Sequence, residues 1–364
     1  MRSVILLLSL FVSFNVLAIT KFTVLSYNVE NLFDTEKDEG KNDWTFLPSN
    51  FKGKKEECNK IGYWRYKEAC HKIDWTEAAL KLKIKQIKRY VESVKPKPTF
   101  IGLNEIENEI VVKRLAKELG YSGYQVSNSP DKRGIDVALL YNEEKDLKFV
   151  HKKEIVLKDK YFKKKPTRNI LEVEFKLKNK DKLTIFVNHW PSLGNPTSTR
   201  LVAAKALKKR MEKLNEKKGH YLIALGDFNT IPENYPRPFE DVLLHKSAFF
   251  DVGELFMNDR KIDRSVKKTM PLGTYFYAPK MSWNMLDRIF VNRRLNDGKG
   301  LDLVRNSYRI HAPRFSRAEH RYDKGHMKGS IVTGIPFAYE HSEKTARKVG
   351  FSDHFGVVAS FIYR

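Results

Sequence analysis

The chain has 364 residues, of which 41% are hydrophobic and 12% aromatic, so it can bury a large core and a disordered class is excluded. Its 68 Lys and Arg residues outnumber its 44 Asp and Glu residues and give a formal net charge of +24. Such an excess indicates a polyanionic partner, such as nucleic acid or an acidic lipid surface, although a uniformly lysine-rich surface would give the same balance.

The first residues have the layout of a secretory signal peptide. Arg2 precedes an apolar run over 4–14, and the small or modest side chains of 16–18 suit a cleavage site. The run is shorter than the roughly 20 residues that a membrane-spanning helix needs. We therefore expect residues 1–18 to be removed and residues 19–364 to form a secreted or periplasmic protein without a stable membrane anchor.

The two cysteines, Cys58 and Cys70, have two interpretations. In an oxidising compartment they can pair, and the short loop that they close would be stabilised by about 3 kcal/mol. Alternatively, they could bind a metal ion together with His71, although structural zinc sites usually have a tighter cysteine spacing. The sequence favours the disulfide over the metal site.

Short apolar or β-branched runs along the chain predict buried strands. These runs are Phe22–Tyr27, Thr99–Leu103, Val137–Tyr141, Leu183–Asn188, Tyr221–Leu225, Arg288–Val291 and Val357–Ile362. Between them, Thr76–Lys95 has apolar residues on one stripe and lysines on the other face, which predicts an amphipathic helix. A second helix is predicted over Ser198–Leu214, beginning at a plausible cap. Strands and helices mixed in this way indicate an α/β or α+β sandwich.

Two insertions interrupt this pattern and leave a single domain without a dividing linker. The first, Asp43–Trp75, holds both cysteines, and the second, Arg293–Tyr339, is rich in Arg, Lys and His. Basic runs also occur at Lys152–Lys165 and Lys205–Lys218, where they are either solvated faces or segments that follow a phosphate backbone.

Acids, amides and histidines gather at the ends of the predicted strands. They are Asn28, Glu30, Glu105, His189, Asp227, Asn229, Asp287, Asp353 and His354. Any one of them could be a turn or cap residue. Together, the carboxylates and the amide supply oxygen ligands suited to Mg²⁺, Mn²⁺ or Ca²⁺, and two histidines can carry protons and charge. Zinc is disfavoured, because no thiolate or paired-histidine spacing accompanies them.

Seven short motifs, in order, resemble those of the endonuclease/exonuclease/phosphatase superfamily, which includes pancreatic-type deoxyribonuclease. They are Ser26-Tyr27-Asn28-Val29-Glu30-Asn31, Leu103-Asn104-Glu105, Arg133-Gly134-Ile135-Asp136, Asn188-His189-Trp190-Pro191-Ser192, Gly226-Asp227-Phe228-Asn229, Leu286-Asp287-Arg288-Ile289 and Ser352-Asp353-His354-Phe355. The resemblance runs from about residue 21 to the C-terminus. It implies a four-layer α/β sandwich, in which two mixed β-sheets pack face to face with helices outside.

The resemblance also implies a metal site and a set of ligands. Glu105 would be the main ligand of Mg²⁺, or of Mn²⁺ or Ca²⁺ in its place. Asn28 and Asp353 would lie near it, and Glu30 would bind the metal or support its ligands. Calcium dependence stays open, because the calcium sites of the pancreatic enzymes have no recognisable counterpart here.

The remaining motif residues are implied to act on the phosphate. Asp227 would orient or deprotonate the attacking water, while Asn229 and His189 would hold the phosphate oxygens. His354, paired with Asp287, would stabilise the charge that develops at phosphorus.

Arg133 falls where family members place a substrate-contacting side chain, and its guanidinium suits a phosphate. Its other interpretation is a turn residue before Gly134.

These features together predict an exported, metal-dependent phosphodiesterase that cleaves nucleic acid, as an endonuclease acting on DNA, and that works as a monomer. The alternative is a phosphatase or a phospholipase-C-type phosphodiesterase for inositol phosphates or sphingomyelin. Trp283–Ile289 resembles the tryptophan-containing motif of the phosphatases, but Leu286 stands where they have a cysteine. A non-catalytic polyanion-binding protein is disfavoured, because every expected catalytic position holds a competent residue type.

Overall fold

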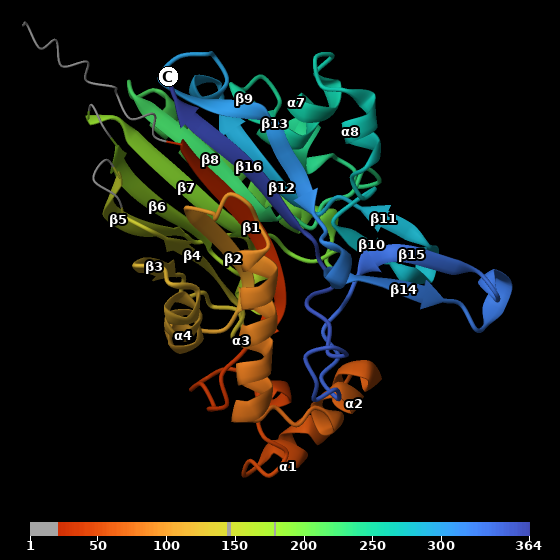
Figure 1. Ribbon diagram of the computed structural model, residues 1–364. Helices are drawn as coiled ribbons and strands as arrows, with labels where there is room; N and C mark the ends of the chain where they lie inside the picture. The colour runs from red at the N-terminus through yellow and green to blue at the C-terminus, as the bar shows by residue number, and fades with distance from the viewer. Residues whose placement is uncertain (1–20, 144–146, 178–179) are drawn as a thin grey trace, which may run out of the picture.

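The computed structural model describes residues 21–143, 147–177 and 180–364, so the predicted signal peptide, residues 1–18, lies outside the described residues. Two six-stranded sheets pack face to face (Figure 1). The first sheet has the order β13 (Leu301–His311), β16 (Gly356–Tyr363), β1 (Lys21–Leu32), β2 (Phe100–Ile106), β4 (Asp136–Tyr141) and β3 (Gly123–Val126). The second has the order β5 (Leu147–Ile155), β6 (Ile170–Leu177), β7 (Lys182–His189), β8 (His220–Asp227), β12 (Asp287–Asn292) and β9 (Phe249–Asp251).

Each sheet is mixed, with one parallel pair at its centre. β1 runs parallel to β2 and β7 runs parallel to β8, whereas the flanking strands β16, β4, β6 and β12 run antiparallel to their neighbours. Because parallel strands end at the same edge of a sheet, the ends of β1 and β2 and the starts of the antiparallel strands lie together. This edge therefore collects side chains from distant parts of the chain.

Apolar side chains from both sheets fill the space between them. Val24 and Phe100 of the first sheet and Ile185 and Leu225 of the second are completely buried there. The sheets approach closely at Gly102, where an added Cβ would lie 2.0 Å from Leu225 Cδ1, so a larger residue would force them apart. This core holds the strand ends of the two sheets in a fixed relation.

Helices cover the outer faces of both sheets, which confirms the predicted four-layer α/β sandwich. α3 (Glu77–Glu92) and α4 (Glu109–Leu119) pack on the first sheet, and α6 (Thr197–Asn215) packs on the second. These layers bury apolar side chains on both faces of each sheet. That is why the central strands read as continuous apolar runs.

The two predicted helices are confirmed with corrected details. Thr76 caps α3, because its hydroxyl accepts a hydrogen bond from the Ala79 amide. Lys83, however, does not lie on the outer, lysine-bearing face: it is completely buried, and its ammonium donates to the Phe351 carbonyl at 3.1 Å. α6 begins at Thr197 without a side-chain cap, so the predicted cap at the start of Ser198–Leu214 is wrong.

All seven predicted strands are present, and several extend further than predicted. Asn28 and Glu30 lie within β1 rather than after it, because the edge residues continue the strand. The second predicted insertion, Arg293–Tyr339, is partly wrong, since it contains β13, the edge strand of the first sheet. The part of this insertion that projects from the sandwich in Figure 1 is the hairpin of β14 (Arg317–Arg321) and β15 (Ile331–Pro336).

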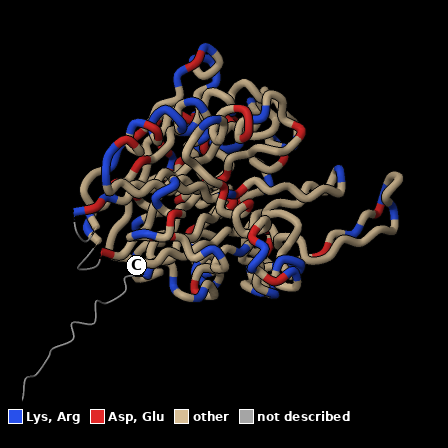
Figure 2. The backbone as a smooth tube through the Cα atoms, turned by 90° about the horizontal axis from the view of Figure 1, so that it is seen from above, with Lys and Arg blue, Asp and Glu red and all other residues tan. Residues whose placement is uncertain are grey.

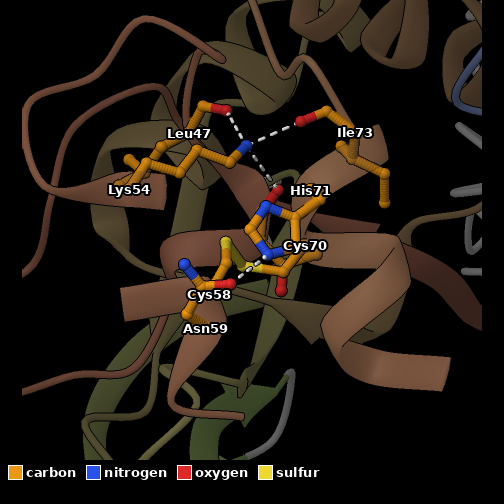
Figure 3. Close-up of a disulfide and its surroundings, with 8 residues drawn as sticks. Leu47, Lys54, Cys58, Asn59, Cys70, His71 and Ile73 are labelled. Carbon is orange, nitrogen blue, oxygen red and sulfur yellow. Dashed lines mark hydrogen bonds between the residues drawn. A yellow bond between two sulfur atoms is a disulfide. The ribbon is translucent and has the colours of Figure 1, made fainter. Parts of the chain in front are cut away.

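The first predicted insertion folds into short helices closed by a disulfide. It contains η1 (Trp44–Phe46), α1 (Lys54–Asn59) and α2 (Trp64–Lys72). Cys58 and Cys70 are bonded to each other (Figure 3), so the alternative metal site with His71 is wrong. His71 instead lies 3.2 Å from the Asn59 side-chain oxygen.

Lys54 holds the insertion together from inside. Its ammonium donates to the Leu47 carbonyl at 2.5 Å, the Ile73 carbonyl at 2.6 Å and the Thr45 carbonyl at 3.3 Å. Burial lowers the pKa of Lys54 to about 8. One side chain thus joins the segments before α1 and after α2.

The remaining elements are short. They are α5 (Lys160–Lys164), η3 (Pro238–Leu243), α7 (Val252–Asn258), α8 (Arg264–Lys268), β10 (Tyr275–Tyr277), η4 (Ala278–Lys280), β11 (Ser282–Asn284), η5 (Arg293–Leu295), η6 (Arg314–Ser316) and η7 (Gly325–Met327). Within the described ranges, no helix has the length and apolarity to cross a membrane. Lys and Arg positions are spread over most outer segments in Figure 2, with Asp and Glu between them.

Candidate active site

The predicted site residues lie together at one edge of the sandwich, where the parallel strands of both sheets end. Asn28 and Glu105 come from β1 and β2 of the first sheet. In the second sheet, His189 and Asp227 are the last residues of β7 and β8 and are register partners. Asp287 begins β12 and is the antiparallel partner of Asp227, so both sheets contribute to one cluster.

Asp227 is the centre of this cluster and is almost completely buried. Its Oδ1 accepts a hydrogen bond from the backbone amide of Asn229 at 2.8 Å. Its Oδ2 accepts from the side-chain amides of Asn229 at 3.1 Å and Asn28 at 3.2 Å. Burial raises the pKa of Asp227 to about 7, although the charge of His354 opposes the rise. A carboxylate that titrates near neutral pH is suited to accept a proton.

His354 and Asp287 form a close buried pair. His354 Nδ1 lies 2.7 Å from Asp287 Oδ2, and its Nε2 lies 4.0 Å from Asp227 Oδ2. Burial alone would lower the pKa of His354, but the carboxylates of Asp287 and Asp353 outweigh it and hold the pKa well above its usual value. His354 is therefore a cation whose Nε2 faces the centre of the site. Tyr275 packs beside it, with ring centroids 5.0 Å apart.

His189 has the opposite electrostatic state. Its Nε2 lies 3.7 Å from Asp227 Oδ2 and 3.8 Å from Glu105 Oε1. Burial, together with the positive charges of Arg168 and Arg133, holds the pKa of His189 well below its usual value. The site thus pairs a neutral histidine with a cationic one.

Arg168 is a residue of this region that sequence reasoning missed. It is buried, and it donates to the Trp190 carbonyl at 2.6 Å and to Asp131 Oδ2 at 3.3 Å. The same carbonyl of Trp190 accepts from the Asn229 side chain at 3.1 Å. Arg168 precedes β6, which was not predicted. A strand prediction for 170–177 would have placed it at this edge, because β6 runs antiparallel to β7.

Glu30 supports the site through hydrogen bonds from two backbone amides. Its Oε2 accepts from the amides of Tyr339 at 2.7 Å and Asp353 at 2.8 Å, which fixes the turn before β16. Burial and the charge of Asp353 raise the pKa of Glu30 to about 8, although the positive charge of Lys83 opposes this rise. Burial in turn lowers the pKa of Lys83 to about 8, and its ammonium lies 4.0 Å from the Tyr339 ring. Glu30 therefore positions Asp353.

The backbone of the site adopts strained conformations. Glu30, Glu105 and Asn229 have positive φ angles of 53°, 61° and 46°, which non-glycine residues rarely adopt. Such strain persists only where the surrounding structure holds it and is typical of functional sites. Gly226 has φ 141°, and an added Cβ would lie 1.9 Å from the Asn188 carbonyl oxygen, so only glycine fits before Asp227.

Arg133 lies at the border of the cluster rather than within it. Its side chain is 58% exposed, with Nε 3.5 Å from Asp131 Oδ1, and its backbone amide donates to the same oxygen at 2.8 Å. Both predicted interpretations of Arg133 are thus compatible with its place: it stands in a turn, and its guanidinium is accessible beside the site.

The donor set fits a magnesium ion. The described residues contain no cluster of three or more His, Cys, Asp and Glu side chains placed to enclose a metal. Mg²⁺ does not need such a cage, since it is usually held by one or two carboxylates together with water and substrate phosphates. Glu105 and Asp353 are partly exposed carboxylates at the mouth of the site, at 22% and 38%. Asn28 donates to Glu105 Oε1 at 3.3 Å and orients it.

Comparison with known families agrees with the motifs and the fold. A model of the endonuclease/exonuclease/phosphatase family matches residues 23–362. The chain belongs to this family. The predicted resemblance is therefore confirmed, and members of this family are hydrolases that act on phosphoesters. No curated protein matches the chain.

Solved structures share the fold of this family member at low sequence identity. A Bacteroides thetaiotaomicron mannosyl-6-phosphatase is 16% identical, with a TM-score of 0.52, covering 94% of this chain and 100% of its own. The human Nocturnin catalytic domain with a bound sulfate anion is 15% identical (TM-score 0.53; 94% and 95% covered). D. rerio TDP2 complexed with a single-strand DNA product is 14% identical (TM-score 0.51; 94% and 99% covered). At these identities the likeness concerns the fold alone.

Proposed function

We propose that this family member is an exported, divalent-metal-dependent phosphodiesterase that hydrolyses nucleic acid, with DNA as the first substrate to test. The observation that carries the proposal is the buried cluster around Asp227. There the buried Asp227 carboxylate, the proposed proton acceptor, has a ring nitrogen of cationic His354 and one of neutral His189 within 4.0 Å. A phosphodiester is anionic, so its hydrolysis needs this combination of a base and positive charge.

The residues divide the chemistry as follows. Asp227 accepts the proton of the attacking water, and Asn229 holds Asp227 in place through both its amides. His354 presents its protonated Nε2 to the charge that develops on the phosphate oxygens, while Asp287 keeps it oriented and charged. Neutral His189 contributes a hydrogen bond to a phosphate oxygen.

A metal ion completes the charge balance. Glu105 and Asp353 would hold Mg²⁺, with Asn28 orienting Glu105. When bound, the ion would polarise the phosphate and offset its negative charge. Mn²⁺ or Ca²⁺ could take the same oxygen ligands.

Two observations support export and a polyanionic substrate. The disulfide between Cys58 and Cys70 is typical of proteins from oxidising compartments, in agreement with the signal-like layout of residues 1–18. The net charge of +24 favours association with a phosphate backbone.

A substrate panel tests the proposal. Protein lacking residues 1–18 is incubated with supercoiled plasmid, RNA, inositol phosphates and sphingomyelin, with Mg²⁺ or with EDTA. We expect nicking of the plasmid that EDTA abolishes. An intact plasmid with Mg²⁺, Mn²⁺ and Ca²⁺, together with phosphate release from inositol phosphates or cleavage of sphingomyelin, would replace the nuclease by the alternative hydrolase.

A further inference from the structure

Two cavities meet at the border of the site, one basic and one mainly apolar. The basic cavity, of about 250 Å³, has these positively charged residues in its wall: Lys132, Arg133, Lys164, Lys165 and Arg168. The apolar cavity, of about 630 Å³, has these apolar residues in its wall: Phe33, Trp44, Phe46, Ile61, Ile73 and Ile135. Tyr66 and Arg133 line both cavities, so the two meet at these side chains.

The basic cavity adjoins the residues that act on phosphate. Arg168 in its wall donates to the carbonyl of Trp190, the residue after catalytic His189. Among the described residues of its wall, Asp131 alone is acidic, and its carboxylate already faces Arg133 at 3.5 Å and Arg168 at 3.3 Å. The charges of Lys132, Lys164 and Lys165 therefore leave the cavity with a positive excess, which suits the phosphate next to the one that is cleaved.

The apolar cavity is built by the disulfide-closed insertion. Trp44 and Phe46 come from η1, and Tyr66 comes from α2, the helix that carries Cys70. Tyr66 is 67% exposed, which is unusual for a large aromatic side chain on a structured helix. An exposed ring next to a basic cavity is the arrangement on which proteins stack nucleic-acid bases.

A basic cavity next to a mainly apolar one favours some phosphate-bearing ligands over others. A nucleotide joins an anionic phosphate to a planar base whose faces stack on aromatic rings, which matches the basic cavity and the mainly apolar cavity beside it. The choline head of sphingomyelin carries a cation that the basic cavity would repel. A base inside a duplex is stacked and paired, so it reaches such a cavity only when it is unpaired.

We propose that the two cavities bind a nucleotide of an unpaired strand next to the scissile phosphate, with its phosphate in the basic cavity and its base against Tyr66. This inference rests on the proposed nuclease function and adds a substrate class to it: single-stranded or locally unpaired nucleic acid. Tyr66 is the residue that distinguishes this class, and Arg133 joins the two subsites.

Matched variants on one helix test the inference. Tyr66→Ala removes the ring, Tyr66→Phe keeps it, and Trp64→Ala removes a ring that is 61% exposed on the same helix but lines neither cavity. Each is assayed with Mg²⁺ on a single-stranded oligonucleotide, on its duplex and on bis(p-nitrophenyl) phosphate, which has no base. Thermal unfolding checks that each variant is folded.

For Tyr66→Ala we expect the KM for the single strand to rise about tenfold, whereas kcat for bis(p-nitrophenyl) phosphate, whose nitrophenyl rings can contact Tyr66 but whose one phosphate reacts at the cluster, should equal that of Trp64→Ala. Tyr66→Phe and Trp64→Ala should behave as wild type. The inference is overturned if Tyr66→Ala leaves the single-strand KM unchanged, if Trp64→Ala has the same effect, or if wild type prefers the duplex; in these cases the nuclease function stands. If wild type hydrolyses bis(p-nitrophenyl) phosphate but no nucleic acid, the proposed function fails as well.

Discussion

The strand-edge cluster and the disulfide-closed insertion are built in contrasting ways. Asp227 and His354 are buried and held by side chains from both sheets. Tyr66, by contrast, stands exposed on a nine-residue helix that one disulfide and the Lys54 hydrogen bonds secure. From this difference we infer a division of roles: the sandwich would supply the proposed chemistry, and the insertion would set the substrate class.

The largest expected effect is on the cluster. Asp227→Asn removes the proton acceptor at nearly constant volume, so we expect kcat for phosphodiester hydrolysis to fall by about 10³-fold. Asp302→Asn is the matched control, because Asp302 is a buried carboxylate paired with the far end of β16. Steady-state kinetics on bis(p-nitrophenyl) phosphate measure both variants, and a rate within threefold of wild type for Asp227→Asn would remove it from the mechanism.

The second effect concerns pH. Activity should rise with pH as Asp227 loses its proton near its pKa of about 7, and it should persist at alkaline pH because the pKa of His354 is well above its usual value. Asp287→Asn removes the main source of that elevation, so the pKa of His354 falls and the alkaline limb moves to lower pH, with a loss of about 10² in kcat. A pH profile of kcat/KM checks this, and an unchanged alkaline limb would show that His354 does not act as a cation.

Breaking the disulfide should affect only the insertion. In the double variant Cys58→Ser, Cys70→Ser, the short loop loses about 3 kcal/mol of stabilisation. We expect the KM for single-stranded nucleic acid to rise about as much as in Tyr66→Ala, because α2 loses its support. Hydrolysis of bis(p-nitrophenyl) phosphate should stay at the wild-type rate; a parallel loss would mean that the insertion also holds the catalytic cluster.

The smallest effect concerns Lys54. Lys54→Met leaves one buried and two partly buried carbonyl groups without their shared donor and should lower the free energy of unfolding by about 1–3 kcal/mol. Lys55→Met, at the exposed neighbouring position of the same helix, is the control and should change it by less than about 0.5 kcal/mol. Denaturant unfolding measures both, and equal values would show that the Lys54 hydrogen bonds do not stabilise the insertion.

The sequence predicted the sandwich and the central strands because their two-sided burial produces uninterrupted apolar runs. Edge strands were harder to predict. β5 has the polar run His151–Glu154 instead of a regular alternation, and β13 is interrupted between Val304 and Arg309, where its register shifts, so neither gives a clear strand pattern.

The polar cluster was predictable by residue type, since its carboxylates and histidines lie beside buried apolar runs of the sequence. The supports of the cluster were not. Lys83 interrupts an otherwise apolar stripe and reads as solvent-facing, but the segment that carries Tyr339 and Phe351 covers it. Arg168 becomes a site residue only through pairing of β6 with β7. The cavities around Tyr66 depend on tertiary contacts of the insertion, which no local pattern records.

The central claim is that the cluster carries out hydrolysis whereas the insertion binds substrate. Its most direct test is the hydrolysis of bis(p-nitrophenyl) phosphate in Mg²⁺ by wild type, Glu105→Gln and Tyr66→Ala. We predict that wild type and Tyr66→Ala hydrolyse it with equal kcat and that the kcat of Glu105→Gln falls about 10²-fold or more, because Glu105 is the main carboxylate proposed to hold the metal. Full activity of Glu105→Gln would contradict the account.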